Sequence, residues 1–239
     1  MSKKIALQEL SIVLAAPGQS PAIVNLENLI FNGTIPKEWE LSREPTYSPQ
    51  AAQLVFTNSV VITAQGNRVV FSEALTGKAL NEMQIGKLAA RYTRSFSELS
   101  YEAVGINPMG HADMGGSEES VRQYFNEKLL AKGSWHQIGD ADAQVQLNFR
   151  YNLPERTLNL AVSEVGLRNE DETISKVVLF SGNFQYLIDE TQSTERLEAV
   201  TQSLARCESD LAEFMTVVDT KFLENASDFS VPTLLPAFA

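Results

Sequence analysis

A long apolar stripe near the C-terminal end of the chain constrains the fold more than any other feature. Its members recur at alternating three- and four-residue steps and close with a step of four: Leu197, Val200, Leu204, Cys207, Leu211, Phe214, Val218 and Phe222. This spacing predicts one helix from about Ser193 to about Glu224, with all eight side chains on one side. Such a helix would be roughly 48 Å long, and would span a domain whose expected radius of gyration is only ~18 Å. It must therefore cover a sheet or pair with a partner.

The stripe is broader than the seam of a dimeric coiled coil. It includes Cys207 and two phenylalanines, and Ala205, Ala212, Met215 and Val217 widen it. A coiled-coil dimer prefers a narrow seam of Leu, Ile and Val with charged flanks, whereas a broad face suits a helix lying on a sheet. We expect the first half of the helix to cover the sheet, and its last turns and the apolar tail to contact a partner. The partner-binding candidates are Val218, Phe222, Phe229, Leu234, Leu235 and Phe238.

Composition limits the classes of protein to which the chain can belong. With 239 residues, 44 % hydrophobic and 21 % charged, it fits a single domain over residues 1–239, with weak halves at 1–110 and 111–239. The net charge of −11 argues against a nucleic-acid partner, which needs clustered Lys and Arg. No signal peptide and no apolar run of ~20 residues occurs, so we expect a cytoplasmic protein without a membrane partner. The lone Cys207 is expected to be a buried hydrophobe.

The alternation of apolar and polar residues predicts an α+β fold with a mainly antiparallel sheet. Strands are expected at 5–15, 54–64, 68–74, 101–106, 145–151, 158–162 and 177–188, the last being central with a bulge at Ser181-Gly182. Helices are expected at 80–96 and 117–130, besides the long C-terminal helix that covers the sheet. Strands gathered in meanders between helices favour α+β over alternating βαβ units. A short likeness between 68–72 and 176–181 suggests two related β-meander/helix halves, but it does not establish a duplication.

The segment from Asn107 to Gly116 is the best local candidate for chemistry. It is expected to be a loop between a strand and a helix, where His111 could act as a general base or metal ligand with Asp113, and Asn107 could contact a ligand. A capping or packing histidine is the competing interpretation. The chain has only two histidines and metal sites normally take three or four ligands, so we expect no metal. No dinucleotide fingerprint, P-loop or nucleophile elbow occurs, so we expect no cofactor and favour a non-enzymatic role.

Residues 33–49 form a second candidate region. Three prolines punctuate this stretch, and Trp39 and Tyr47 would pin it to the body of the protein. A long loop without regular structure is often functional, so the two aromatics could be the walls of a ligand pocket. A clasp over a sheet edge explains the same residues equally well.

Three stretches together resemble a family of uncharacterised bacterial proteins of similar length. They are Gly33-Thr34-Ile35-Pro36-Lys37-Glu38-Trp39-Glu40-Leu41, Asn67-Arg68-Val69-Val70-Phe71 and Val104-Gly105-Ile106-Asn107-Pro108-Met109-Gly110-His111. The resemblance implies a complete protein, and it supplies no activity and no catalytic residue.

Three functions follow as hypotheses. The first is a non-enzymatic interaction or assembly protein, homodimeric or bound to another protein, that uses the C-terminal helix and apolar tail. The second is a small-molecule-binding protein or hydrolase-type enzyme with a site near Asn107, His111 and Asp113. The third is a binding module with a pocket beneath residues 33–49. The first is preferred because apolar surfaces are visible in the sequence, whereas no reactive group is.

Overall fold

One antiparallel sheet organises the fold, so the α+β prediction is confirmed. The computed structural model describes residues 4–138, 143–169 and 172–224. The sheet has nine strands within these residues, in the order β2-β3-β4-β5-β1-β6-β9-β8-β7. Their bounds are β1 Ala6–Ala15, β2 Thr46–Tyr47, β3 Ala51–Val55, β4 Val60–Gln65, β5 Arg68–Ala74, β6 Ala103–Asp113, β7 Gln146–Leu153, β8 Arg156–Arg168 and β9 Ile174–Leu187.

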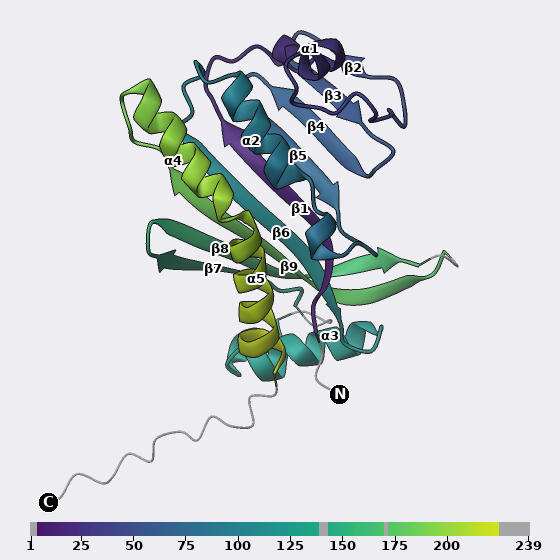
Figure 1. The fold of residues 1–239 in the computed structure, drawn as a ribbon. Coiled ribbons are helices and arrows are strands. Elements are labelled where there is room, and N and C mark those ends of the chain that lie inside the picture. Colours follow the sequence, from purple (N-terminus) through teal and green to yellow (C-terminus); the bar gives the residue numbers. More distant parts are fainter. Residues whose placement is uncertain (1–3, 139–142, 170–171, 225–239) are drawn as a thin grey trace, which may run out of the picture.

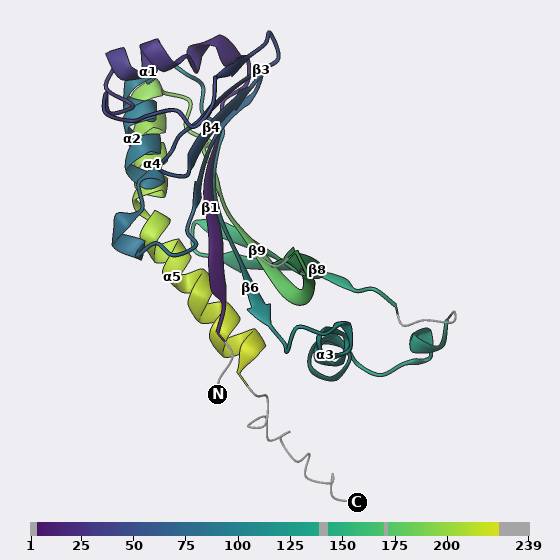
Figure 2. The ribbon, with the colours of Figure 1, turned by 90° about the vertical axis from the view of Figure 1, so that its right-hand side faces the viewer.

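Helices lie on both sides of this sheet, most of them on one side (Figure 1 and Figure 2). They are α1 Leu26–Phe31, α2 Ile85–Ser95, α3 Glu118–Tyr124, α4 Ser193–Ala205 and α5 Cys207–Val217, with short 3-10 turns at Pro21–Ile23, Leu80–Glu82 and Ser134–Gln137, and π turns at Phe125–Leu129 and Val218–Leu223. Helices α2, α4 and α5 lie side by side or end to end on one side of the sheet (Figure 1). Figure 2 shows α3 on the other side, beyond the end of β6. The sheet therefore has one covered face and one face without a helical layer over its middle.

The core lies between the sheet and these three helices. Alternate residues of the central strands point toward the helices, as Leu10, Ile12 and Leu14 of β1 do, and all three are buried. Phe71 of β5 meets Tyr92 of α2 edge-on, with ring centroids 5.4 Å apart. The buried apolar residues of the whole sheet form one continuous cluster, which binds the first and last strands of the chain into one core.

The predicted single C-terminal helix is wrong in its continuity, although its apolar stripe is buried. Leu197 and Phe222 at the two ends are half-buried, and the six stripe residues between them are buried. The helix breaks at Arg206, whose amide bonds back only three residues to Ser203 O, at 3.1 Å. Figure 2 shows α4 and α5 running in different directions. A straight helix this long would lose contact with a twisted sheet before its end. The break at Arg206 lets α4 and α5 each pack on the strands beneath it.

The strand predicted at 101–106 is also wrong in extent. It continues as β6 to Asp113, so most of the expected loop at 107–116 is a central strand. Pro108 explains the error, because proline is rare in central strands, where it cannot donate a ladder hydrogen bond. The pairing of β6 with β9 passes from Ile106–Phe184 to Met109–Ser181 and omits the residues between, including Pro108.

The bulge expected at Ser181-Gly182 does not occur there. Pairing between β9 and β8 runs without a register shift through both residues, and the irregularity lies in β1, between Leu7 and Glu9. Gly182 serves packing, since a Cβ on it would lie 2.9 Å from Cδ2 of Phe214 on α5. The missing side chain thus lets α5 approach the sheet closely.

Residues 40–47 run along the edge of the sheet beside β3. Ser42 N donates to Val55 O at 2.8 Å and Thr57 N donates to Glu40 O at 2.9 Å. This segment uses backbone groups that an edge strand would otherwise expose. In the part of the chain that the structure describes, no helix has the length and apolar character needed to cross a membrane.

Candidate functional site on the open face of the sheet

The face of the sheet turned away from α2, α4 and α5 has no helical layer over its middle among the described residues (Figure 2). We call it the open face. Its central positions on five adjacent strands carry aliphatic, hydroxyl or amide side chains, all half-buried: Val70 and Ser72 of β5, Ser11 and Val13 of β1, Asn107 and Met109 of β6, Ser181, Asn183 and Gln185 of β9, and Asn159 and Ala161 of β8.

Charged residues on this face lie away from its middle. Arg68 begins β5, Arg150 lies on the edge strand β7, and Asp113 ends β6. Glu9 is the carboxylate nearest the middle, and partial burial raises its pKa. A chain with a net charge of −11 thus presents an almost neutral central surface on this face.

Four side chains form a hydrogen-bonded row across the middle of the open face. We call Ser11, Asn107, Asn183 and Asn159 the amide row; they lie on β1, β6, β9 and β8 in that order. Asn159 Nδ2 donates to Asn183 Oδ1 at 3.4 Å. Asn183 Nδ2 donates to Asn107 Oδ1, and Asn107 Nδ2 donates to Ser11 Oγ at 3.4 Å. The bonds all point the same way, from β8 toward β1.

Two neighbouring residues of β6 make room for the row. Pro108 lacks an N–H, and the backbone pairing of β6 with β9 is interrupted there, so the side chains of Asn107 and Asn183 connect the strands instead. Gly105 lies beside this pair. A Cβ on Gly105 would lie 3.3 Å from Asn183 Nδ2, closer than an ordinary contact, and 3.5 Å from Asn107 Oδ1, so a larger residue would crowd the Asn183 amide.

The row suits recognition of neutral polar groups. Each asparagine amide carries two donors and one acceptor oxygen with two lone pairs, and the row uses only part of this capacity. The remaining donors and acceptors match a peptide group, which also carries one of each. No member of the row is a nucleophile activated by a base, or a carboxylate or imidazole that could transfer a proton. The arrangement therefore favours binding over catalysis.

The predicted candidates of the 107–116 segment lie along one strand on the open face. Asn107, His111 and Asp113 all face this side of β6, where Asn107 and Asp113 are about 20 Å apart at ~3.3 Å per residue. Asp113 Oδ1 accepts hydrogen bonds from the amides of Gly115 and Gly116, at 2.7 and 2.8 Å, so it fixes the turn after β6. His111 is half-buried, and its Nδ1 has no hydrogen-bond partner among the described residues. Asn107 is therefore too far from Asp113 to act with it on one small group, whereas His111 and Asp113 are neighbours on this face, about 7 Å apart.

The two aromatic candidates lie near the β3 edge. Trp39 is half-buried and meets Phe56 edge-on, with ring centroids 5.1 Å apart. Tyr47 is exposed, and its hydroxyl accepts a hydrogen bond from the Leu26 amide at 3.3 Å. Both residues hold the 33–49 segment against the body of the protein, as a clasp would.

Of the partner-binding candidates, two fall within the described residues. Val218 is fully buried, so its predicted contact with a partner is wrong: the close fit of the last turns against the sheet leaves it no exposed surface. Phe222 is half-buried, and its ring lies 5.4 Å from that of Phe149 and 5.8 Å from that of Phe180. Phe229, Leu234, Leu235 and Phe238 lie outside the described residues.

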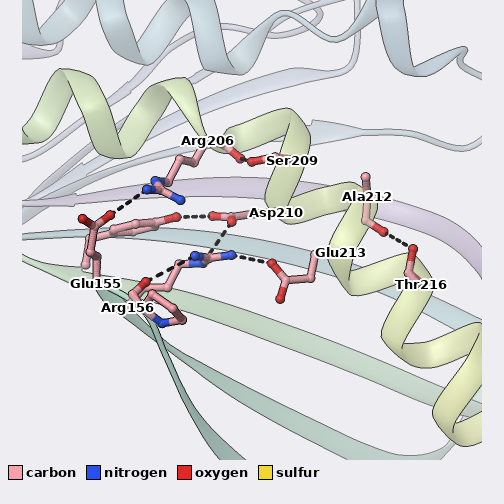
Figure 3. Close-up of polar contacts among 10 residues, drawn as sticks. Glu155, Arg156, Arg206, Ser209, Asp210, Ala212, Glu213 and Thr216 are labelled. Atoms are coloured by element: carbon pink, nitrogen blue, oxygen red, sulfur yellow. Dashed lines mark hydrogen bonds and ion pairs between the residues drawn. The ribbon is translucent and has the colours of Figure 1, made fainter.

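A charged cluster lies beneath α5 on the covered face (Figure 3). The fully buried Asp210 accepts a 2.6 Å hydrogen bond from the Tyr186 hydroxyl. Its other oxygen lies 3.2 Å from Arg156 Nε, as an ion pair without hydrogen-bond geometry. Arg156 also pairs with Glu213 and lies over the Phe184 ring, 5.6 Å from its centroid.

Opposing influences act on the pKa of Asp210. Burial is the largest influence and raises its pKa, although the Tyr186 hydrogen bond and the Arg156 charge oppose this shift. Burial, with Asp210 as a further cause, also raises the pKa of Tyr186. Arg156 begins β8 and Asp210 lies on α5, so the cluster ties the β7–β8 hairpin to the helix. Sequence reasoning missed it, because its members are far apart in the chain.

A groove of about 480 Å³ separates α2 from α4 and α5. Lys87, Arg91 and Arg94 form its rim on α2, and Leu204 and Cys207 contribute to its floor. Among the described residues, these three cations form no ion pair. The groove has the size of a small-molecule site, and Glu208 of α5 also lines it.

The amide row was found in part by sequence reasoning, through Asn107, whereas Ser11, Asn159 and Asn183 were missed. No group of three or more His, Cys, Asp or Glu side chains with metal-site geometry occurs among the residues that were searched, which are the described ones. No protein-family model matches this chain, and the search of curated proteins found no match to it.

Proposed function

We propose that this protein is a non-enzymatic interaction protein that holds a protein partner against the open face of its sheet. The amide row carries the proposal. A neutral, half-buried row of amides on an uncovered sheet is unusual for a chain with a net charge of −11. Cores of protein interfaces are depleted of charged residues, and a protein partner supplies the peptide groups that the free amide donors and acceptors match.

This proposal moves the partner contact from the C-terminal helix to the opposite side of the sheet. Helices α4 and α5 bury their apolar stripe in the core, so little of the stripe is exposed to a partner. The apolar tail, with Phe229, Leu234, Leu235 and Phe238, stays a proposed additional contact. Deletion of residues 226–239 tests it, and unchanged partner capture and unchanged mass in solution would remove the tail from the proposal.

Site-specific photo-crosslinking tests the open face directly. A photo-reactive amino acid at Gln185, half-buried on the open face, is compared with the same group at Thr201, exposed on α4. In cells that produce the protein, we expect the group at position 185 to give one crosslinked product of discrete mass. The group at position 201 should give no product of that mass. Asn183→Lys should abolish the crosslink because it places a charge in the neutral row, while Gln202→Lys on α4 should leave it. Equal crosslinking from both positions would contradict the proposal.

Small-molecule binding is the second candidate, and two observations favour it. His111 Nδ1 has no hydrogen-bond partner among the described residues, and the groove between α2 and α4 has the volume of a ligand site. These two candidate sites are distinguished by screening metabolites for ligands that raise the melting temperature of the protein. A shift lost in His111→Ala locates the ligand near the Asn107–Asp113 side of the open face, and a shift lost in Arg91→Ala locates it in the groove.

We also keep the hypothesis of two related halves. The strand order supports it: β1 and β6 are neighbours at the middle, and β5-β4-β3 and β9-β8-β7 step outward from them. Each set is followed by a helix on the covered face, α2 after β5 and α4 after β9. On this view the amide row crosses the junction of the halves, between β1 and β6.

A further inference from the structure

The two edges of the sheet differ in a way that bears on self-association. At one edge, β2 has only two residues, and residues 40–47 occupy part of the β3 backbone. At the other edge, β7 has eight residues, and its sequence QLNFRYNL contains no proline and one charge, Arg150. In an antiparallel strand, every second residue directs its N–H and C=O away from the neighbour. The β7 edge is therefore a template for another strand.

The helical layer also ends short of β7. Side chains of β7 on the covered face, Leu147, Phe149 and Leu153, are only half-buried, and Tyr151 is 37 % exposed. Phe149 stacks on Tyr151 with ring centroids 6.2 Å apart, and its other ring contact is Phe222. An apolar strip thus runs along the edge where no other described strand pairs with β7. This strip is a second and independent reason to expect a partner there.

We propose that two copies of this chain pair through β7, antiparallel across a two-fold axis, and so join their sheets into one. A second copy of this chain is the proposed partner of the β7 edge, because the two edges of the sheet differ in length. The β2 edge has only two residues, too few to pair along the eight residues of β7. The β7 edge therefore pairs with its own copy, which closes the assembly at two chains. The pairing would also unite the two open faces into one surface.

The sequence of β7 suits one register. With Phe149 opposite Phe149 of the second copy, Leu147 lies opposite Tyr151, and Asn148 opposite Arg150. Apolar side chains then lie opposite apolar ones on the covered face. On the open face, the neutral Asn148 lies opposite the charged Arg150. No two like charges of β7 lie opposite each other. Each chain carries a net charge of −11, so added salt should strengthen the dimer by screening the repulsion.

Sedimentation of the full chain over a concentration series tests the proposal. We expect a particle of twice the 26.4 kDa chain mass at high concentration, with the dimer fraction rising between low and high salt. Asn148→Lys places Lys opposite Arg150 twice in the dimer, and should weaken dimerisation by roughly tenfold. Adding Arg150→Glu to Asn148→Lys replaces both repulsions by attractions and should restore the dimer. Thr46→Lys on the β2 edge is the matched control, and should leave the dimer unchanged.

A wild-type chain that stays monomeric at all concentrations would overturn the proposal. So would an Asn148→Lys variant, folded by circular dichroism, that dimerises as the wild type does. Dimerisation lost with Thr46→Lys but kept with Asn148→Lys would assign the interface to the opposite edge and would also overturn it.

Discussion

Asn183 of β9 donates a side-chain hydrogen bond to Asn107 of β6 beside Pro108, where the backbone pairing of these two strands is interrupted. The same Asn183 accepts a hydrogen bond from Asn159 of β8. One side chain therefore links three strands at the middle of the sheet. It also occupies the middle of the surface to which we assign partner binding, so its stability role and its binding role must be measured separately.

The first prediction concerns this link. Asn183→Ala leaves Asn107 Oδ1 and Asn159 Nδ2 without their partners, and should lower the free energy of unfolding by about 1–2 kcal/mol, because water reaches these half-buried groups only in part. Urea denaturation measures the loss. Asn152→Ala, exposed on the same face of β7, is the control and should change stability by less than about 0.5 kcal/mol. Equal effects would mean that the row contributes nothing to stability.

The second prediction concerns Gly182. Gly182→Ala would place a Cβ 2.9 Å from the Phe214 ring and 3.2 Å from Pro108 Cγ, and should cost about 1–3 kcal/mol through overpacking. Gly66→Ala is the control, since nothing lies within 4 Å of a Cβ at that turn residue. The cost of Gly182→Ala should be smaller in a Phe214→Leu background, where the crowding ring is gone. An equal cost in both backgrounds would show that helix α5 does not press on β9.

The sequence predicted the elements whose pattern is local. Alternation located β1, the β4–β5 hairpin and the β7–β8 hairpin, although the strand expected at 54–64 is in fact two strands, β3 and β4, which pair with each other across a turn. The spacing of the C-terminal stripe identified which side chains of α4 and α5 are buried. It could not reveal the break at Arg206, because the break follows from the twist of strands elsewhere in the chain.

The candidate site shows the same division between local and distant information. Asn107 was singled out with Pro108 as part of a loop, because proline normally excludes a central strand. The other three members of the amide row come from β1, β8 and β9, and only the register of the sheet brings them together. A one-residue slip of any of these strands would turn its member to the covered face. No pattern within a short window contains that register.

The third prediction is a pH dependence of stability that originates in Asp210. Its pKa in the folded protein lies above the ordinary 3.8, so between these two values the folded state binds more protons than the unfolded state. The contribution of Asp210 to stability is therefore complete below about pH 3.8, and is lost as the pH rises through the folded pKa. Asp210→Asn removes this loss, so the stability of the wild type minus that of the variant should fall as the pH rises above about 4. A difference that is constant or rises with pH would contradict the assigned direction of the shift.

The last prediction concerns Cys207, whose burial is confirmed at 5 % exposure. Burial, followed by the nearby charge of Asp210, raises the pKa of this thiol to about 12. At pH 8 the reactive thiolate would make up only about one part in ten thousand, and the attacking reagent would also lack access. We expect a disulfide reagent such as DTNB to label the native protein over hours and the urea-unfolded protein within seconds. Because the chain contains one cysteine, the colour reports this site alone. Labelling of the native protein as fast as that of the unfolded protein would show that α5 lifts from the sheet readily, or that the groove between α2 and α4 admits the reagent to Cys207.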